Sequence, residues 1–250
     1  MEKADSTRAM SQVDFALGLL WYFVYTYSTV CHEAAHAWAA HKLGDDTAYH
    51  GGQVSLDPIP HMKREPIGMI LVPIVTFLIN AANGMTWMMG WASAPYDPQW
   101  ATRYPRRAAL MAMAGPAANL ILALLAAFFI RVGISAGWFV AASSFQFADF
   151  VAPSHPDKML ELAATLLGVT FSLNLLLCCF NLLPLPPLDG SCIPLFFLRE
   201  DKVEAYQQML WTPTIQFIGM AVAFRSFGYF FHPVLTFFVN LLYHGHVYYS

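Results

Sequence analysis

The chain has 250 residues, of which 57% are hydrophobic and 12% charged, and its mean hydropathy is +0.47. This composition is typical of a membrane protein, so the lipid bilayer is the first partner that the sequence predicts. The formal net charge is −3, and neither a basic run nor an acidic tail is present, which argues against nucleic acid as a partner. The four cysteines lack CxxC spacing, so we expect neither a disulfide framework nor a thiolate zinc site. Nothing in the sequence indicates an oligomeric state.

Residues 1–14 form a polar amino-terminal segment, and residues 15–250 are expected to form a single membrane-embedded domain. A helix rises about 1.5 Å per residue, so about 20 apolar residues cross a hydrocarbon core of about 30 Å. The sequence therefore predicts an all-α polytopic membrane protein with about five spans, at 15–40, 67–91, 108–130, 160–183 and 215–242. Residues 132–151 are apolar but broken by glycines, serines and Asp149, so they are either an interfacial or re-entrant piece or a sixth span.

The first predicted span contains the motif His32-Glu33-Ala34-Ala35-His36. Histidines at i and i+4 lie on one face of a helix and can hold one divalent metal ion, while the intervening Glu33 can act as a general base on a water at the metal. An ionisable group deep in hydrocarbon costs about 2.5–3.5 kcal/mol by insertion scales, so such groups usually serve a function. The motif and its setting together predict a metal site inside the membrane.

A second polar group follows the fourth predicted span, in the run Asn181-Leu-Leu-Pro-Leu-Pro-Pro-Leu-Asp-Gly190. Three prolines interrupt the helix, so the backbone there is irregular and is expected to line a wetted cavity enclosed by protein. Asp189 is the best candidate for a third ligand, because a catalytic zinc site takes three protein ligands and leaves one position open. The alternative is a polar Asp-Gly turn at the membrane surface, which we favour less beside the histidine pair.

The third predicted span contains Gly115-Pro116-Ala117-Ala118-Asn119. A Gly-Pro pair permits close helix approach, and Asn119 supplies an amide in apolar surroundings. Asn119 could satisfy backbone groups freed by Pro116, or it could donate a hydrogen bond to the oxyanion of a tetrahedral intermediate. The second role would make Asn119 a catalytic residue.

Residues 50–58 read HGGQVSLDP, and polar and apolar side chains alternate from Gln53 to Leu56 after a glycine pair. This pattern predicts a short strand or β-hairpin next to the metal motif. It could be a loop hairpin that packs against the bundle, or a strand edge that captures the extended backbone of a substrate. Both interpretations stay open.

Taken in order, these motifs resemble the site-2 protease family of intramembrane zinc metalloproteases. The resemblance covers residues 15–200 and rests on the histidine motif, on GGQVSLDP followed by His61, on Gly115–Asn119 and on Asn181–Gly190. It is closest to compact members without PDZ or cystathionine-synthase-type domains. The linker Gly90–Pro98 only loosely matches the proline-valine repeat common in those members.

The resemblance implies an intramembrane zinc metalloprotease that hydrolyses peptide bonds in or near the transmembrane segments of other membrane proteins. One zinc ion (Zn²⁺) per chain would be bound by His32, His36 and Asp189, with Glu33 as the general base. The alternative is a membrane metal transporter or a non-catalytic metal-binding scaffold, since the same ligands coordinate zinc without catalysis. A transporter has no need of a base next to the first histidine, so we favour the protease.

The orientation in the membrane receives two opposing predictions. Family members place the active site toward the cytosolic face, which would put the carboxyl end of the first span in the cytosol. With five crossings, the positive-inside rule instead favours a cytoplasmic amino terminus, by seven basic residues to five. The seven are Lys3, Arg8, Arg103, Arg106, Arg107, Arg199 and Lys202, and the five are Lys42, Lys63, Arg64, Arg131 and Lys158. We follow the resemblance, because a difference of two charges is small.

Overall fold

A computed structural model describes residues 12–83, 85–142 and 146–243, so the predicted polar segment 1–14 lies outside the described residues as far as residue 11. The described chain is mostly helical. Its elements are α1 (Gln12–Leu43), α2 (Thr47–His50), α3 (Pro58–Arg64), the π-helical turn η1 (Ile67–Leu71), α4 (Val72–Ala82), α5 (Pro98–Arg103), α6 (Pro105–Ser135), β1 (Phe139–Ala141), β2 (Val151–Pro153), α7 (Lys158–Asn181), the 3-10 helix η2 (Asp189–Phe196), α8 (Glu200–Leu210) and α9 (Pro213–Leu242).

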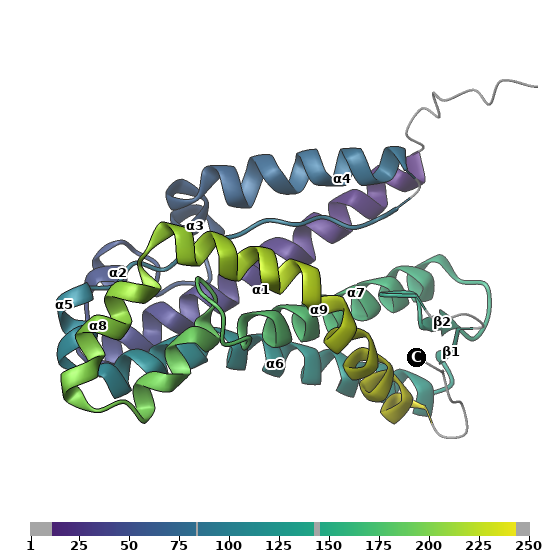
Figure 1. Cartoon of the computed structure of the whole chain (residues 1–250). Helices are drawn as coiled ribbons and strands as arrows, with labels where there is room; N and C mark the ends of the chain where they lie inside the picture. The colour runs from purple at the N-terminus through teal and green to yellow at the C-terminus, as the bar shows by residue number, and fades with distance from the viewer. Residues whose placement is uncertain (1–11, 84, 143–145, 244–250) are drawn as a thin grey trace, which may run out of the picture.

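Three long helices, α1, α6 and α7, pack together at the centre of the molecule, and α6 contacts both of the others (Figure 1). Alanines form much of the contact between α1 and α6, with Ala39 and Ala40 of α1 buried in one cluster with Ala108 and Ala109 of α6. Small side chains allow helix backbones to approach closely in a membrane. This contact brings the carboxyl-terminal half of α1 against the amino-terminal half of α6.

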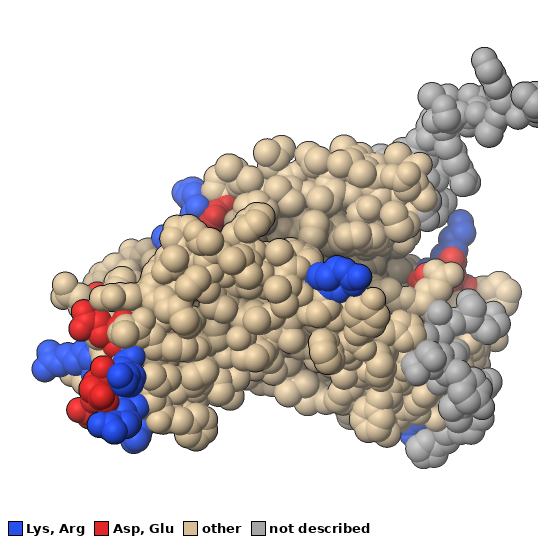
Figure 2. All heavy atoms as spheres, viewed as in Figure 1, with Lys and Arg blue, Asp and Glu red and all other residues tan. Residues whose placement is uncertain are grey.

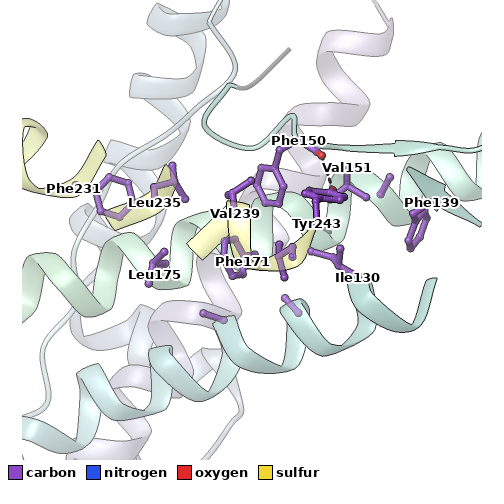
Figure 3. Close-up of a cluster of buried hydrophobic side chains, with 14 residues drawn as sticks. Ile130, Phe139, Phe150, Val151, Phe171, Leu175, Phe231, Leu235, Val239 and Tyr243 are labelled. Atoms are coloured by element: carbon purple, nitrogen blue, oxygen red, sulfur yellow. Dashed lines mark hydrogen bonds between the residues drawn. The ribbon is translucent and has the colours of Figure 1, made fainter. Parts of the chain in front are cut away.

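A second core lies where α6, α7 and α9 meet the small sheet (Figure 3). The rings of Phe150 and Phe171 meet edge to face with centroids 5.5 Å apart, and the Tyr243 hydroxyl donates to the Phe150 carbonyl at 2.6 Å. Strands β1 and β2 pair antiparallel, with Phe139 opposite Pro153. Residues 132–151 therefore contribute the end of α6, a strand and a connection, and their described part contains no helix that could be a sixth span.

Among the described residues, α6, α7 and α9 are the helices long and apolar enough to cross a membrane by themselves. The helical stretch 67–82, formed by η1 and α4, is long and apolar enough only when α3 is added to it. The two parts are bent by 112° relative to each other. Apolar side chains such as Leu124, Phe128 and Phe217 point outward, and the face over α4 and α9 is almost free of charge (Figure 2). The structure thus supports three spans, or four with the bent pair, and the count of five is not established.

The second predicted span, 67–91, is wrong in its last third. The helix ends at Ala82, and residues 85–97 have no helix or strand assigned and run back alongside α4 (Figure 1). Hydrogen bonds to α4 and η1 hold this returning segment: Asn80 Nδ2 donates to the Trp87 carbonyl at 3.0 Å, and the Trp91 N–H donates to the Gly68 carbonyl at 3.1 Å. The apolar pattern did not reveal the reversal, because apolar residues such as Met85, Met88 and Met89 continue the apolar run beyond the end of the helix.

The reversal also corrects the sequence-based distribution of basic residues. The side chains of Trp100 and Arg107 both donate to the Leu43 carbonyl, so α5 and the start of α6 lie at the carboxyl end of α1. α8 packs on α5 at the same end, where Figure 2 shows most charged side chains gathered. The basic residues at this end are Lys42, Lys63, Arg64, Arg103, Arg106, Arg107, Arg199 and Lys202. Those at the ends of helices on the opposite side are Arg131 and Lys158.

The strand predicted at Gln53–Leu56 is absent, because the described backbone there forms turns. Gly52 adopts a φ of +73°, and the Gln53 N–H donates to the Ala48 carbonyl, which closes the short helix α2. His61 contacts the Ser55 carbonyl through Nε2 at 3.0 Å. Local turns and α3 therefore use backbone groups that a substrate-capturing edge would need. The two strands that do form are β1 and β2, much later in the chain.

Thr76 offers a test of the returning segment, because its hydroxyl oxygen accepts the Met89 N–H at 3.2 Å. Thr76→Val keeps the shape but removes this acceptor, and should lower the free energy of unfolding by about 1 kcal/mol. The measurement is thermal unfolding in detergent. Thr170→Val is the matched control, since the hydroxyl of Thr170 bonds within its own helix, to Leu166. Equal stability of the two variants would show that the segment does not depend on this bond.

Candidate metal centre

Two histidines of α1, His32 and His36, meet the side chain of Asp189, which is far away in sequence, inside the helical layer. The two Nε2 atoms lie 3.0 Å apart, and Asp189 Oδ2 lies 3.1 Å from His32 Nε2 and 3.3 Å from His36 Nε2. Both histidines are 6% exposed. Ligand atoms around a tetrahedral zinc with bonds of about 2.0–2.1 Å lie about 3.3 Å apart, so the three atoms are spaced as zinc ligands are.

The backbone explains why these three residues meet. His32 and His36 project from one face of α1, as the i, i+4 spacing predicts. Asp189 opens η2 after residues 182–188, where no regular helix continues and three prolines occur. η2 packs against α6, which also packs against α1. The proline-rich break therefore carries a carboxylate across to the histidines.

Each imidazole is oriented by a hydrogen bond from its other nitrogen. His36 Nδ1 donates to the Met111 carbonyl at 2.8 Å, and His32 Nδ1 donates to Asn119 Oδ1 at 2.5 Å. A neutral imidazole that donates through Nδ1 carries its lone pair on Nε2. Both Nε2 lone pairs then face the Asp189 carboxylate, and three acceptors in one buried place fit a bound cation.

Gly115 leaves room for that cation. A Cβ atom added at this position would lie 2.3 Å from His36 Nε2 and 2.5 Å from His32 Nε2, which is close to the length of a zinc–nitrogen bond. The absent side chain thus marks a space that touches both imidazole nitrogens. The donor set, the spacing and this space together fit zinc.

The structure places Asn119 beside the candidate ligand His32, with contacts that differ from both of the expected roles. Its Oδ1 holds His32, while its Nδ2 donates to the Ser28 carbonyl at 3.2 Å and to Asn174 Oδ1 at 2.8 Å. Both amide hydrogens are therefore used, and the residue is completely buried. This geometry leaves no donor for an oxyanion and makes Asn119 a positioning residue for His32.

Asn174 and Ser28 were not singled out from the sequence. Asn174 Nδ2 donates to Ser28 Oγ and to the Thr170 carbonyl, both at 2.8 Å. The hydrogen-bonded series His32–Asn119–Asn174 thus ends on Ser28 of α1 and Thr170 of α7. A polar amide in an apolar helix is the only signal that could have found Asn174.

Glu33 follows His32 in α1 and is 6% exposed. Cys192 and Tyr96 also lie near Asp189, and its charge contributes to the pKa of both groups. Burial, and secondarily that charge, raises the pKa of the Cys192 thiol to about 12. Burial, followed by charges at Cys192 and Asp189, also raises the pKa of Tyr96.

Comparison with known proteins agrees with this site. Residues 21–223 match peptidase family M50. The "Putative zinc metalloprotease YwhC" of Bacillus subtilis is 36% identical over 183 residues, covering 70% of this chain and 68% of its own length. The "Putative zinc metalloprotease Rip2" of Mycolicibacterium smegmatis is 28% identical over 187 residues, covering 75% of this chain and 60% of its own length. No solved structure matches the chain.

The chain belongs to peptidase family M50, the site-2 protease family, since the match covers most of its length. It is therefore a zinc metalloprotease and a membrane protein, as the resemblance of its motifs implied.

Gly115→Ala tests the metal site without touching a ligand. The added methyl group would occupy the space beside both Nε2 atoms, so zinc content of the detergent-purified protein should fall severalfold. Elemental analysis measures it. Gly228→Ala in α9 is the control, because a Cβ there meets nothing within 4 Å. Full zinc occupancy in Gly115→Ala would show that the ion lies elsewhere.

Proposed function

We propose that this chain is an intramembrane endopeptidase that hydrolyses peptide bonds in or near the transmembrane segments of other membrane proteins. The observation that carries the proposal is the position of the three candidate zinc ligands, which meet between the apolar helices α1 and α6 with Glu33 next to them. Lys42 lies six positions after His36, which is about 9 Å of helix, so water need penetrate only a short way from that end.

The proposed topology has four crossings, by α1, α6, α7 and α9. The stretch from η1 to residue 97 enters and leaves at the carboxyl end of α1, and replaces the expected second crossing. Eight basic residues at this end stand against Arg131 and Lys158 at the other, among the described residues. The positive-inside rule then favours a cytosolic carboxyl end of α1, which agrees with a cytosolic active site.

The roles of the site residues follow from their positions. His32, His36 and Asp189 would hold one zinc ion per chain. Zinc in such a site polarises a carbonyl and makes water acidic enough to be activated near neutral pH. Glu33 would take the proton of the attacking water and pass it to the leaving amine, as general acid–base catalysis requires. Asn119 would keep the His32 lone pair directed at the ion.

A metal transporter or a non-catalytic scaffold is the alternative. Transport would require further ligands along a path through the bundle. Within the described residues, the group at His32 is the one place where three His, Cys, Asp or Glu ligand atoms converge. The described residues therefore offer no second metal site along a transport path. Glu33 has a role in hydrolysis but none in transport.

Glu33→Gln tests proteolysis directly. The amide cannot accept the proton, so cleavage should fall at least about a hundredfold, within the usual contribution of a general base. The assay co-expresses the chain with a panel of single-pass membrane proteins and follows product by immunoblot. Zinc content should stay that of the wild type. Cleavage by Glu33→Gln at the wild-type rate would remove Glu33 as the base, and a panel that the wild type leaves intact would count against the proposed function.

Asp189→Ala tests the third ligand. Loss of the carboxylate leaves two protein ligands, so zinc content after dialysis should fall at least about tenfold. Elemental analysis of the purified variant measures this change. Asp157→Ala serves as the control, because Asp157 caps the amino end of α7 at a distance from the site. An Asp189→Ala variant that retains its zinc would disqualify this residue as a ligand.

A further inference from the structure

The helix α9 carries one permanent charge, on Arg225. This residue is exposed, and Figure 2 shows basic atoms on the otherwise uncharged face over α9. Residues at helical spacing on both sides of it, Ile218, Val222 and Tyr229, are exposed as well. We call these four side chains the outer face of α9. Since α9 is long and apolar enough to cross a membrane, its outer face is turned toward the bilayer.

Arg225 lies close to the middle of the span. It follows Pro213 by twelve positions and precedes Leu242 by seventeen, so it is only about 4 Å along the helix from the midpoint between these ends. In a span centred on the bilayer, the headgroups begin more than about 10 Å from the Arg225 backbone. A guanidinium at this depth is costly, and charged groups inside spans usually pair with an opposite charge or serve a function.

The contacts of Arg225 leave room for a further partner. Among the described residues, its side chain makes one hydrogen bond, from Nη1 to the Tyr229 hydroxyl at 3.3 Å. Its Cζ lies 5.9 Å from the centre of the same ring. A guanidinium has five N–H donors, and the ion pairs within the described residues do not include Arg225. Tyr229 thus holds the charge near the middle of the span, without a counter-charge from the described part of the chain.

The depth of the charge indicates what kind of partner fits it. Lipid phosphates lie outside the hydrocarbon core, farther from this depth than an arginine side chain reaches. A carboxylate can approach at the same depth on another span, which must be helical because lipid cannot satisfy its backbone groups. The outer face of α9 offers Ile218, Val222 and the Tyr229 ring for packing against such a helix. A membrane helix with a central acid therefore fits both the charge and its surroundings.

We propose that the outer face of α9 binds a transmembrane helix of another membrane protein that carries Asp or Glu near its centre, and that this carboxylate pairs with Arg225. A guanidinium can bond both oxygens of a carboxylate, so the two charges compensate each other away from water. Either charge alone in hydrocarbon is costly, so the pair selects partners by the depth of their acid. The inference does not depend on which reaction the metal centre performs.

A helix that is bound here would lie close to elements that build the metal centre. Phe224 and Phe227, on either side of the arginine in sequence, line an apolar cavity of about 660 Å³ that α1, α7 and the returning segment line as well. Nearer the start of α9, Gly219 packs directly against Pro186, three positions before Asp189. α9 therefore connects the proposed docking face with the segment that positions the third candidate ligand.

A designed peptide tests the pair. The probe is a polyleucine helix of about 20 residues with one Glu at its centre, and the matched probe has Gln there. Energy transfer between labelled peptide and labelled full chain measures binding in phosphatidylcholine vesicles. The chain carries Glu33→Gln, so that the probe is not cleaved. The Glu probe should bind about tenfold more tightly than the Gln probe, and equal binding would overturn the proposal.

Arg225→Leu tests which residue recognises the acid. It removes a charge from an exposed position, so zinc content should not change, whereas the preference for the Glu probe should disappear. Lys158→Leu is the matched control, because it removes an equal exposed charge at the start of α7 and should keep the preference. A preference that survives Arg225→Leu, or that Lys158→Leu abolishes equally, would contradict a pair at Arg225.

Two further arms distinguish a protein carboxylate from a lipid phosphate. Moving the Glu of the probe by about seven positions toward either end displaces it by about 10 Å and should remove the preference. Replacing part of the lipid by phosphatidylglycerol should leave the preference unchanged. Equal binding of the displaced Glu, or loss of the preference in phosphatidylglycerol, would mean that Arg225 reaches the headgroups and would overturn the proposal. No arm requires cleavage, so failure of this docking face leaves the proposed proteolytic function untouched.

Discussion

The proposed chemistry of this protein depends on the contact between Asp189 and two imidazole nitrogens inside a bundle of apolar helices. Burial of a carboxylate costs free energy unless a counter-charge or a metal compensates it. Both histidines use Nδ1 to bond neighbouring oxygens, so their Nε2 atoms and the carboxylate meet as three acceptors. Without a cation these three acceptors repel one another. The hydrogen bonds of the surrounding helices hold them together.

That support comes from helix packing. Alanines bring α1 close to α6, and Gly115 keeps the space next to both imidazoles open. Asn119 then connects His32 to Asn174 of α7, which joins three helices through one chain of amides. The proline-rich segment before η2 places the Asp189 carboxylate next to the two histidines. Helix packing therefore sets the spacing of the candidate ligands.

The return of residues 85–97 along α4 has two consequences that extend beyond the site. It returns the chain to the carboxyl end of α1, so α6, α7 and α9 each run opposite to the direction expected from a simple crossing, and the basic residues gather near the metal ligands. It also leaves an extended backbone with one bonded and one unbonded edge beside an apolar cavity. The proposed orientation in the membrane thus arises from this local feature.

The sequence by itself determined the membrane class, and it singled out the histidine pair with Glu33 between them and Asp189 after a proline-rich break. Composition and i, i+4 spacing are local properties of the chain, so no tertiary structure is needed to find them. The sequence indicated long helices near 15–40, 108–130, 160–183 and 215–242, but it misplaced the extended element, which lies at 85–97 and not at 53–56. Only the tertiary structure decided that Asn119 holds His32 and that residues 85–97 turn back along α4. Both depend on hydrogen bonds between segments far apart in the chain, and no periodicity in a single segment encodes such partners.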